Sequence, residues 1–162
     1  MIYGNYFLED SNKRILYHAS PVQGLKEIEP RRDHINPKVK QACVYASPNK
    51  DYAACFGGRW HDDIGTLSVF TSNGKRKLYF GLTDKIDITK PCSLYEIIDD
   101  GTGLAVNNYE IAFTHSMKVH KETKYKSFKD MLIKNNINVT SKEEMDNFKF
   151  TGEVPNFNNY FD

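Results

Sequence analysis

The sequence has little that points to a membrane, an export signal or a nucleic-acid surface. It contains no run of about 18 apolar residues, so we expect no segment to cross a membrane as a helix. Its first residues do not join a basic start to an apolar stretch, and we expect no signal peptide. Lysine and arginine total 22 against 21 aspartates and glutamates, a balance that argues against a dedicated nucleic-acid binder.

The motifs of the commonest catalytic and nucleotide-binding sites are also missing. No G-x-x-x-x-G-K-[ST], G-x-G-x-x-G, H-E-x-x-H, C-x-x-C or G-x-S-x-G sequence occurs. The cysteines Cys43, Cys55 and Cys92 lack the spacing of zinc ligands, so we expect no metal site. We expect them to be buried, reduced thiols in a cytoplasmic protein. A small nucleotide ligand needs only a local pair of cations and is not excluded.

What is present is the composition of one folded domain. Apolar residues make up 40% of the chain and charged residues 27%, as is typical of globular proteins. Short apolar or alternating runs predict strands over 15–18, 42–46, 66–70, 77–80, 92–98 and 109–113. The dipeptide Asn73-Gly74 predicts a hairpin. This order indicates a single α+β domain over residues 1–162, with a mostly antiparallel, split β-sheet and a few short helices.

Capping residues and turn residues locate the remaining elements. Three helices are expected: one over about 49–56 after Ser47, one from Ser127, and one from a capping box of Thr140 and Glu143. One helical turn is expected over 24–28, and the basic stretch from Lys118 to Lys134 is interpreted as a solvated face. The aromatic residues of the tail, Phe157, Tyr160 and Phe161, are expected to pack on the body of the domain.

Three polar residues at strand ends are candidates for chemistry. His18 follows an apolar run, Tyr45 precedes the first predicted helix, and Glu110 opens the last predicted strand. Each has an ordinary structural explanation: a hydrogen-bonded core histidine, a tyrosine packed on a sheet, and a solvated glutamate. Their order along the chain is what suggests a common site.

The segments around these residues resemble the ADP-ribosyltransferase superfamily. The resemblance is carried by Leu16-Tyr17-His18-Ala19-Ser20, Gly24-Leu25, Ile28-x-Pro30, Val44-Tyr45-Ala46-Ser47-Pro48 and Tyr52-Ala53, and continues to Tyr109-Glu110-Ile111-Ala112-Phe113. It is similar to the His-Tyr-Glu branch, which includes diphtheria-type toxins, poly-ADP-ribose polymerases and small bacterial or phage relatives. The resemblance implies an ADP-ribosyltransferase-like fold and NAD as substrate.

The resemblance also implies a role for each candidate. His18 would hold the ribose and the nicotinamide amide of NAD, and Tyr45 would stack on the nicotinamide ring. Glu110 would hydrogen-bond a ribose hydroxyl and stabilise an oxocarbenium-like transition state, because a fixed carboxylate favours positive charge that forms only there. Glu96 is the alternative if Glu110 is not the family glutamate. Many relatives carry Gln or Glu two residues before this glutamate, where this chain has Asn108.

Further contacts to NAD are expected from residues near these motifs: Ala19, Ser20, Tyr52, Arg31 and Arg59, with Arg32 as another cation of the same loop. The leading hypothesis is an enzyme that transfers ADP-ribose from NAD to a macromolecular acceptor of unknown identity, or hydrolyses NAD. The alternatives are an RNA 2'-phosphotransferase-like enzyme and a non-catalytic binding or interaction domain on the same fold.

Overall fold

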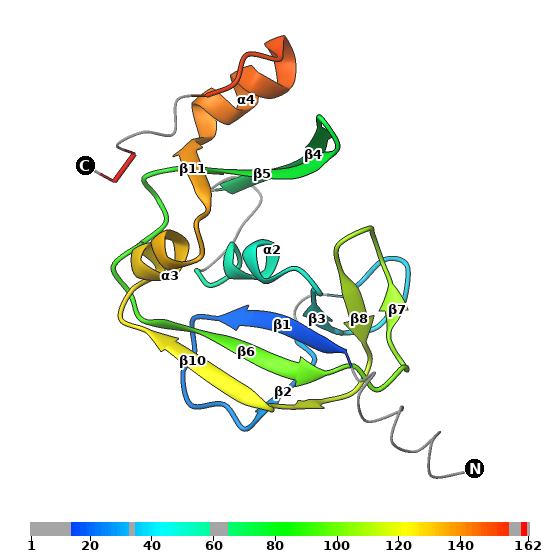
Figure 1. Ribbon diagram of the computed structural model, residues 1–162. Coiled ribbons are helices and arrows are strands. Elements are labelled where there is room, and N and C mark those ends of the chain that lie inside the picture. The colour runs from blue at the N-terminus through cyan, green and yellow to red at the C-terminus, as the bar shows by residue number, and fades with distance from the viewer. Residues whose placement is uncertain (1–13, 33–34, 59–64, 156–159, 162) are drawn as a thin grey trace.

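The computed structural model describes residues 14–32, 35–58, 65–155 and 160–161. These residues form an α+β structure with mostly antiparallel sheets and three short helices, as the sequence predicts (Figure 1). Within this part of the chain, no helix has both the length and the apolar character that a membrane crossing needs.

The first sheet consists of β1 (Ile15–Ser20), β6 (Cys92–Ile98) and β10 (Lys121–Tyr125), with β6 antiparallel to both neighbours. The lysines of this stretch are mostly exposed, in agreement with the expected solvated face over 118–134, although residues 121–125 form the edge strand β10 of this sheet. Exposed lysines along an edge strand discourage pairing with other chains. This accounts for a strand with so basic a sequence.

A two-stranded sheet of β2 (Glu27–Ile28) and β9 (Met117–Lys118) lies beside the first sheet. The predicted helical turn over 24–28 is wrong. The backbone of Glu27 and Ile28 pairs with β9, and the Ile28 side chain is buried in the core. A partner so far along the chain gives no local signal in the sequence.

The third sheet carries Tyr45 and meets the first sheet, which carries His18. It consists of β3 (Val44–Ala46), β8 (Ile111–Phe113) and β7 (Leu104–Ala105), all antiparallel to their neighbours. Tyr17 of β1 and Ser47, which follows β3, exchange backbone hydrogen bonds of 2.7 and 2.9 Å. The two sheets therefore meet where β3 ends.

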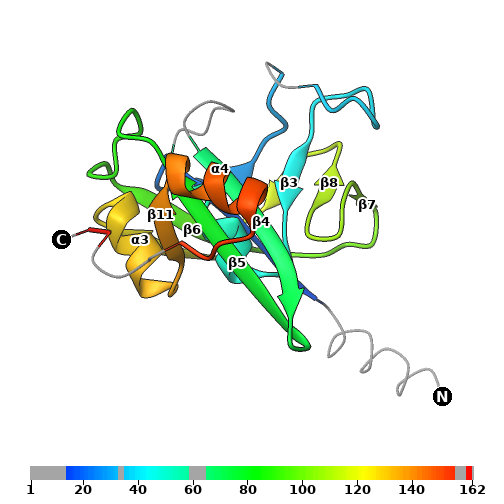
Figure 2. The ribbon, with the colours of Figure 1, turned by 90° about the horizontal axis from the view of Figure 1, so that it is seen from above.

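A long hairpin forms the fourth sheet, with β4 (Gly65–Ser72), β5 (Lys75–Leu82) and β11 (Asn138–Ser141). The predicted turn is confirmed: Asn73 and Gly74 have φ of 52° and 75°, the positive values that a tight two-residue hairpin requires. β11 pairs with β5 in parallel, a contact that the sequence analysis did not anticipate. Seen from above, α4 (Lys142–Thr151) crosses this hairpin (Figure 2).

The helices begin close to the predicted positions, with two differences. Ser127 caps α3 (Phe128–Lys134) by accepting the amide of Asp130 at 3.0 Å, as predicted. The helix α2 (Lys50–Ala54) is shorter than predicted, and its N-cap is Asn49. For α4 the predicted capping box is one residue out of register, because Ser141 caps the helix by accepting the amide of Glu144. Thr140 is instead buried in β11.

Two hydrophobic clusters hold these layers together. The larger lies between the first sheet and the hairpin, and α2 and α3 fill this space (Figure 1). The smaller lies against β1, β3, β6 and β8. Tyr160 and Phe161 pack on the larger cluster as predicted, whereas Phe157 lies outside the described residues. Cys43, Cys55 and Cys92 are buried and free, in agreement with the expected reduced thiols.

Candidate functional site

His18 lies next to β3 and bonds to it directly. Its Nδ1 is 2.6 Å from the backbone carbonyl oxygen of Tyr45. A carbonyl oxygen only accepts hydrogen bonds, so Nδ1 carries the proton, and the neutral ring keeps a lone pair on Nε2. Burial lowers the pKa of His18, and the bond to Tyr45 opposes that change only in part. The imidazole is therefore neutral at pH 7, with an acceptor lone pair on Nε2.

Tyr45 is held by a loop that precedes its own strand. Its hydroxyl accepts a hydrogen bond of 2.9 Å from the side-chain amide of Asn36, which is itself buried. The Asn36 Oδ1 accepts the backbone amides of Lys38 and Val39, so the orientation of the Asn36 amide is fixed. The pKa of Tyr45 is raised mainly by burial, and the negative charge of Glu110 adds to that increase. Tyr45 is thus protonated and oriented.

Glu110 lies in a turn directly before β8. The expected strand over 109–113 begins only at Ile111, because the Oδ1 of Asn107 accepts the backbone amides of Tyr109 and Glu110 at 2.8 and 2.9 Å. The Glu110 Oε1 accepts hydrogen bonds from the Tyr52 hydroxyl at 2.8 Å and from the Asn107 amide at 3.1 Å. The carboxylate is therefore fixed by two donors.

The register of the third sheet explains how these residues meet. Tyr45 pairs with Ala112 and Ala46 with Ile111, so Glu110 comes at the end of β3 that leads into α2. Tyr52 reaches Glu110 from α2. The histidine, the tyrosine and the glutamate, which lie far apart in the sequence, thus gather around the end of one short strand.

Glu96, the alternative carboxylate, lies elsewhere. It is on β6, paired with Tyr17 of β1 on one side and Lys121 of β10 on the other. Its carboxylate is 3.9 Å from the Lys121 ammonium. Because β1 lies between Glu96 and β3, Glu110 is the glutamate that accompanies Tyr45.

The remaining predicted contacts differ in how they are placed. Ala19 is buried against the larger core cluster, and the Ser20 hydroxyl accepts the backbone amide of Val22 at 3.1 Å. Arg31 is exposed, and Arg59 lies outside the described residues. Tyr52 is 8% exposed and reaches the site through its bond to Glu110.

Sequence reasoning missed two residues of this site, Asn36 and Asn107. It considered Asn108 instead, which is exposed, whereas the side chain that touches Glu110 belongs to Asn107. A signal was present in both cases. Asparagine before a strand or inside a polar loop commonly folds its side chain back onto the amides two or three residues later.

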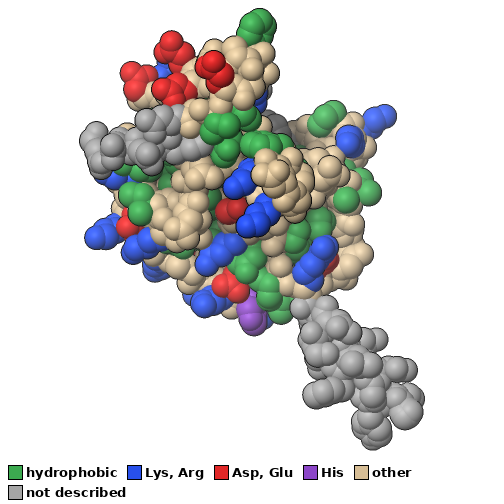
Figure 3. Space-filling model, turned by 45° about the horizontal axis from the view of Figure 1, so that its top comes forward, with side chains coloured by type: hydrophobic (Ala, Val, Ile, Leu, Met, Phe, Trp, Pro, Cys, Tyr) green, Lys and Arg blue, Asp and Glu red, His purple; other side chains and the backbone are tan. Residues whose placement is uncertain are grey.

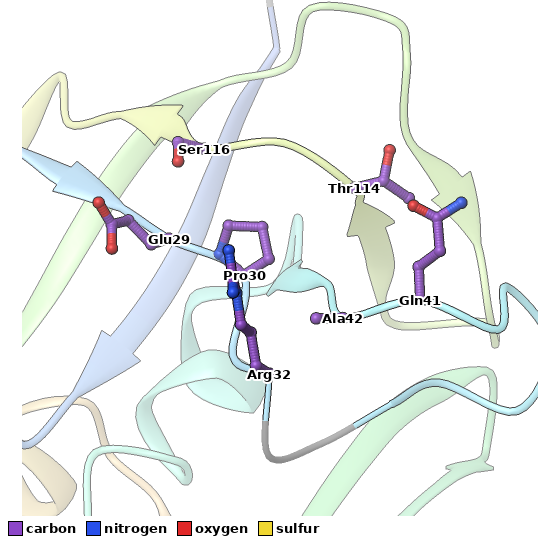
Figure 4. A pocket seen from close by; sticks show the side chains of 7 residues that line it. All are labelled: Glu29, Pro30, Arg32, Gln41, Ala42, Thr114 and Ser116. Carbon is purple, nitrogen blue, oxygen red and sulfur yellow. The ribbon is translucent and has the colours of Figure 1, made fainter.

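A pocket of 540 Å³ lies on the same sheet, and its lining includes none of His18, Tyr45 and Glu110 (Figure 4). It is at the opposite end of β3 and β8 from Glu110, because Ala42 precedes β3 and Thr114 follows β8. Its lining is mostly polar and is formed by Glu29, Pro30, Arg32, Gln41, Ala42, Thr114 and Ser116. Arg32, which the sequence analysis considered as a phosphate contact, points into this pocket with Glu29 nearby (Figure 4).

The charges of the surface are mixed. Figure 3 shows carboxylates toward the top of the view, over α4, and lysines and arginines spread over the face below. The exposed acidic residues of α4 are Glu143, Glu144 and Asp146. On the face in view, the described residues form no continuous basic patch of the kind that binds nucleic acid. Among the described residues, no cluster of His, Cys, Asp or Glu side chains has the composition to hold a metal ion.

Comparison with known proteins leaves the site to be interpreted from its own geometry. No protein-family model matches the chain, and no curated protein or solved structure matches it.

Proposed function

We propose that this protein is an NAD-binding enzyme of the ADP-ribosyltransferase type, with an ADP-ribosyltransferase-like fold. The observation that carries the proposal is the grouping of His18, Tyr45 and Glu110 around the end of β3. The sequence resemblance concerns these same residues, and it required that they meet.

The chemistry of the group suits cleavage of the bond between ribose and nicotinamide. This bond breaks with its electron pair going to the nicotinamide nitrogen, so positive charge develops on the ribose. The carboxylate of Glu110, held by two donors, stabilises that charge without having to reorganise. A nucleophilic group of the acceptor, or water, then bonds to the ribose carbon and releases its proton to the solvent.

The other two residues bind and orient the substrate. The neutral His18 accepts a hydrogen bond at Nε2 from a ribose hydroxyl, because its Nδ1 is already committed to the Tyr45 carbonyl. The Tyr45 ring offers a flat apolar face to the nicotinamide at small entropic cost. The acceptor is a macromolecule or water. The three free thiols favour a cytoplasmic site of action.

The test is release of nicotinamide from NAD by purified protein, with and without cell extract as a source of acceptors. Replacing Glu110 by Gln keeps the shape of the side chain and removes its charge, so we expect turnover to fall by about 10²- to 10³-fold while NAD still binds. Tyr45→Ala should instead weaken NAD binding, because stacking acts before the transition state.

A matched control is Glu96→Gln, which removes a β6 carboxylate that faces the Lys121 ammonium and is separated from β3 by β1. We expect this variant to retain full turnover. Equal loss in both glutamate variants would show that general charge, and not Glu110, matters. If the wild-type protein is stabilised by NAD but releases no nicotinamide under either condition, the protein is a non-catalytic binding domain. If NAD neither binds nor reacts, the proposal fails.

A further inference from the structure

The Glu110 carboxylate is held by two donors on the same oxygen. The hydroxyl of Tyr52 and the side-chain amide of Asn107 both donate to Oε1. No described residue is hydrogen-bonded to the other oxygen, Oε2. One oxygen is therefore tied to the protein, while the other is left for a ligand.

The first donor is itself rigid. Tyr52 is 8% exposed, and its ring stacks on that of Tyr109 with centroids 5.4 Å apart and an interplanar angle of 27°. Phe56 contacts the same ring from a tilted orientation, also at 5.4 Å. Burial and the nearby charge of Glu110 raise the pKa of Tyr52 far above its usual value, so the hydroxyl keeps its proton throughout the physiological range. Tyr52 is a permanent donor in a fixed place.

The second donor has only one possible orientation. The Asn107 Oδ1 accepts the backbone amides of Tyr109 and Glu110. An amide oxygen accepts and an amide nitrogen donates, so the NH₂ group must point toward the carboxylate. Asn107 therefore has two functions: it stabilises the turn that carries Glu110, and it donates a hydrogen bond to the Glu110 carboxylate.

We propose that Tyr52 and Asn107 are positioning residues for Glu110, which hold Oε1 so that Oε2 faces the ribose of NAD. This inference rests on the proposed function, because it assigns the oxygen that acts in that reaction. It also gives Tyr52 a different role from the NAD contact that the sequence suggests. Tyr52 acts through Glu110, since its ring is already packed between protein side chains.

The test uses substitutions that remove a donor and little else. Tyr52→Phe keeps the packed ring and loses the hydroxyl, so kcat for nicotinamide release should fall about tenfold or more, while the dissociation constant of NAD stays unchanged. Tyr125→Phe is the matched control. Tyr125 is 6% exposed at the end of β10, and its hydroxyl accepts a hydrogen bond from the side-chain amide of Asn135 instead of donating to Glu110. It should lose a similar degree of thermal stability and no activity.

A double-mutant cycle separates positioning from general structural support. In the Glu110→Gln background, Tyr52→Phe should have almost no further effect on kcat, because the group that it positions no longer carries the catalytic charge. Asn107→Asp is the second variant. It keeps oxygen acceptors for the two backbone amides, so the turn is preserved, but it replaces the donor by a second carboxylate beside Glu110. Its kcat should fall further than that of Tyr52→Phe.

The outcomes distinguish this inference from the proposed function. If wild type and Tyr52→Phe turn over at the same rate, the enzyme hypothesis stands and the positioning role is wrong. If Tyr52→Phe lowers kcat equally in both backgrounds, the tyrosine supports the fold and does not act through Glu110, and the inference is again overturned. If wild type releases no nicotinamide, the proposed function fails and takes this inference with it.

Discussion

Acidification should destabilise this protein through His18. The imidazole is neutral in the folded protein because burial lowers its pKa below the ordinary value of 6.5. Protonation would place a charge in a poorly hydrated position, next to a backbone carbonyl that already uses the Nδ1 proton. The unfolded chain has no such restriction and takes up the proton freely.

The sign and size of the effect follow from this difference in pKa. Between the lowered pKa of the folded state and 6.5, the unfolded state binds more protons, so stability falls as the pH falls through this window. One group can contribute at most about 1.36 kcal/mol per pH unit. At pH 5.5 the loss is therefore about 1.4 kcal/mol at most, a decrease in Tm of about 3–5 °C for a chain of this length.

The assay compares thermal unfolding of wild type and His18→Gln between pH 8 and pH 5.5. The glutamine amide is a neutral donor for the Tyr45 carbonyl and does not titrate. Every other titratable group is the same in both proteins, so the difference between them isolates His18. We expect the wild-type Tm to fall more than that of the variant, by at most about 3–5 °C. Parallel decreases in the two proteins would refute the reasoning.

Three further predictions concern stability and are read from thermal or urea unfolding. Gly81→Ala should lower the free energy of unfolding by about 1–3 kcal/mol, because the added Cβ would lie 2.5 Å from Cγ of Met145, which is fully buried in α4. An unchanged stability would show that α4 moves freely over β5. Leu132→Ala should cost about 2–5 kcal/mol, since this side chain is fully buried in the larger cluster, and a loss below 1 kcal/mol would contradict that packing. Ser127→Ala should cost about 1 kcal/mol by removing the acceptor for the Asp130 amide, whereas Ser127→Asp should keep the cap.

The parts of the fold that the sequence predicted are those with local causes. Asn73-Gly74 is a turn because both residues tolerate positive φ, so this dipeptide alone is enough to predict it. Ser127 caps a helix because its hydroxyl bonds an amide three residues away. Such signals need no knowledge of the rest of the chain.

The missed parts depend on partners that are distant in the sequence. The Glu27–Ile28 strand exists only because residues 117–118 pair with it, and β10 is a strand because β6 lies beside it. The shift of the last cap from Thr140 to Ser141 has the same origin. Pairing with β5 extends β11 through Ser141, so the helix begins one residue later.

The candidate site also contains residues that the sequence predicted and residues that it missed. The resemblance predicts that His18 and Tyr45 belong to one site, and the hydrogen bond between the His18 ring and the Tyr45 carbonyl makes them neighbours. The contribution of Asn107 depends on the turn before β8, whose boundary the alternating pattern placed two residues too early. Sequence patterns located the strands of the site, but hydrogen bonds within the turns decide which side chains touch.

The parallel pairing of β11 with β5 has a consequence for synthesis of the chain on the ribosome. Residues 79–82 of β5 must wait for residues 138–141, so one side of β5 has no partner strand while about 60 further residues are made. At roughly 5–20 residues per second, that interval lasts about 3–12 s. During it the outer backbone of β5 is available to any other extended chain. The first residues of β5 are basic: Lys75, Arg76 and Lys77. They precede the stretch that pairs with β11, so their charges do not protect residues 79–82 from pairing with other chains. The nascent protein therefore passes through a stage in which Leu78, Phe80 and Leu82 lie on an incomplete sheet. Pairing of β11 with β5 ends the period in which this edge can aggregate.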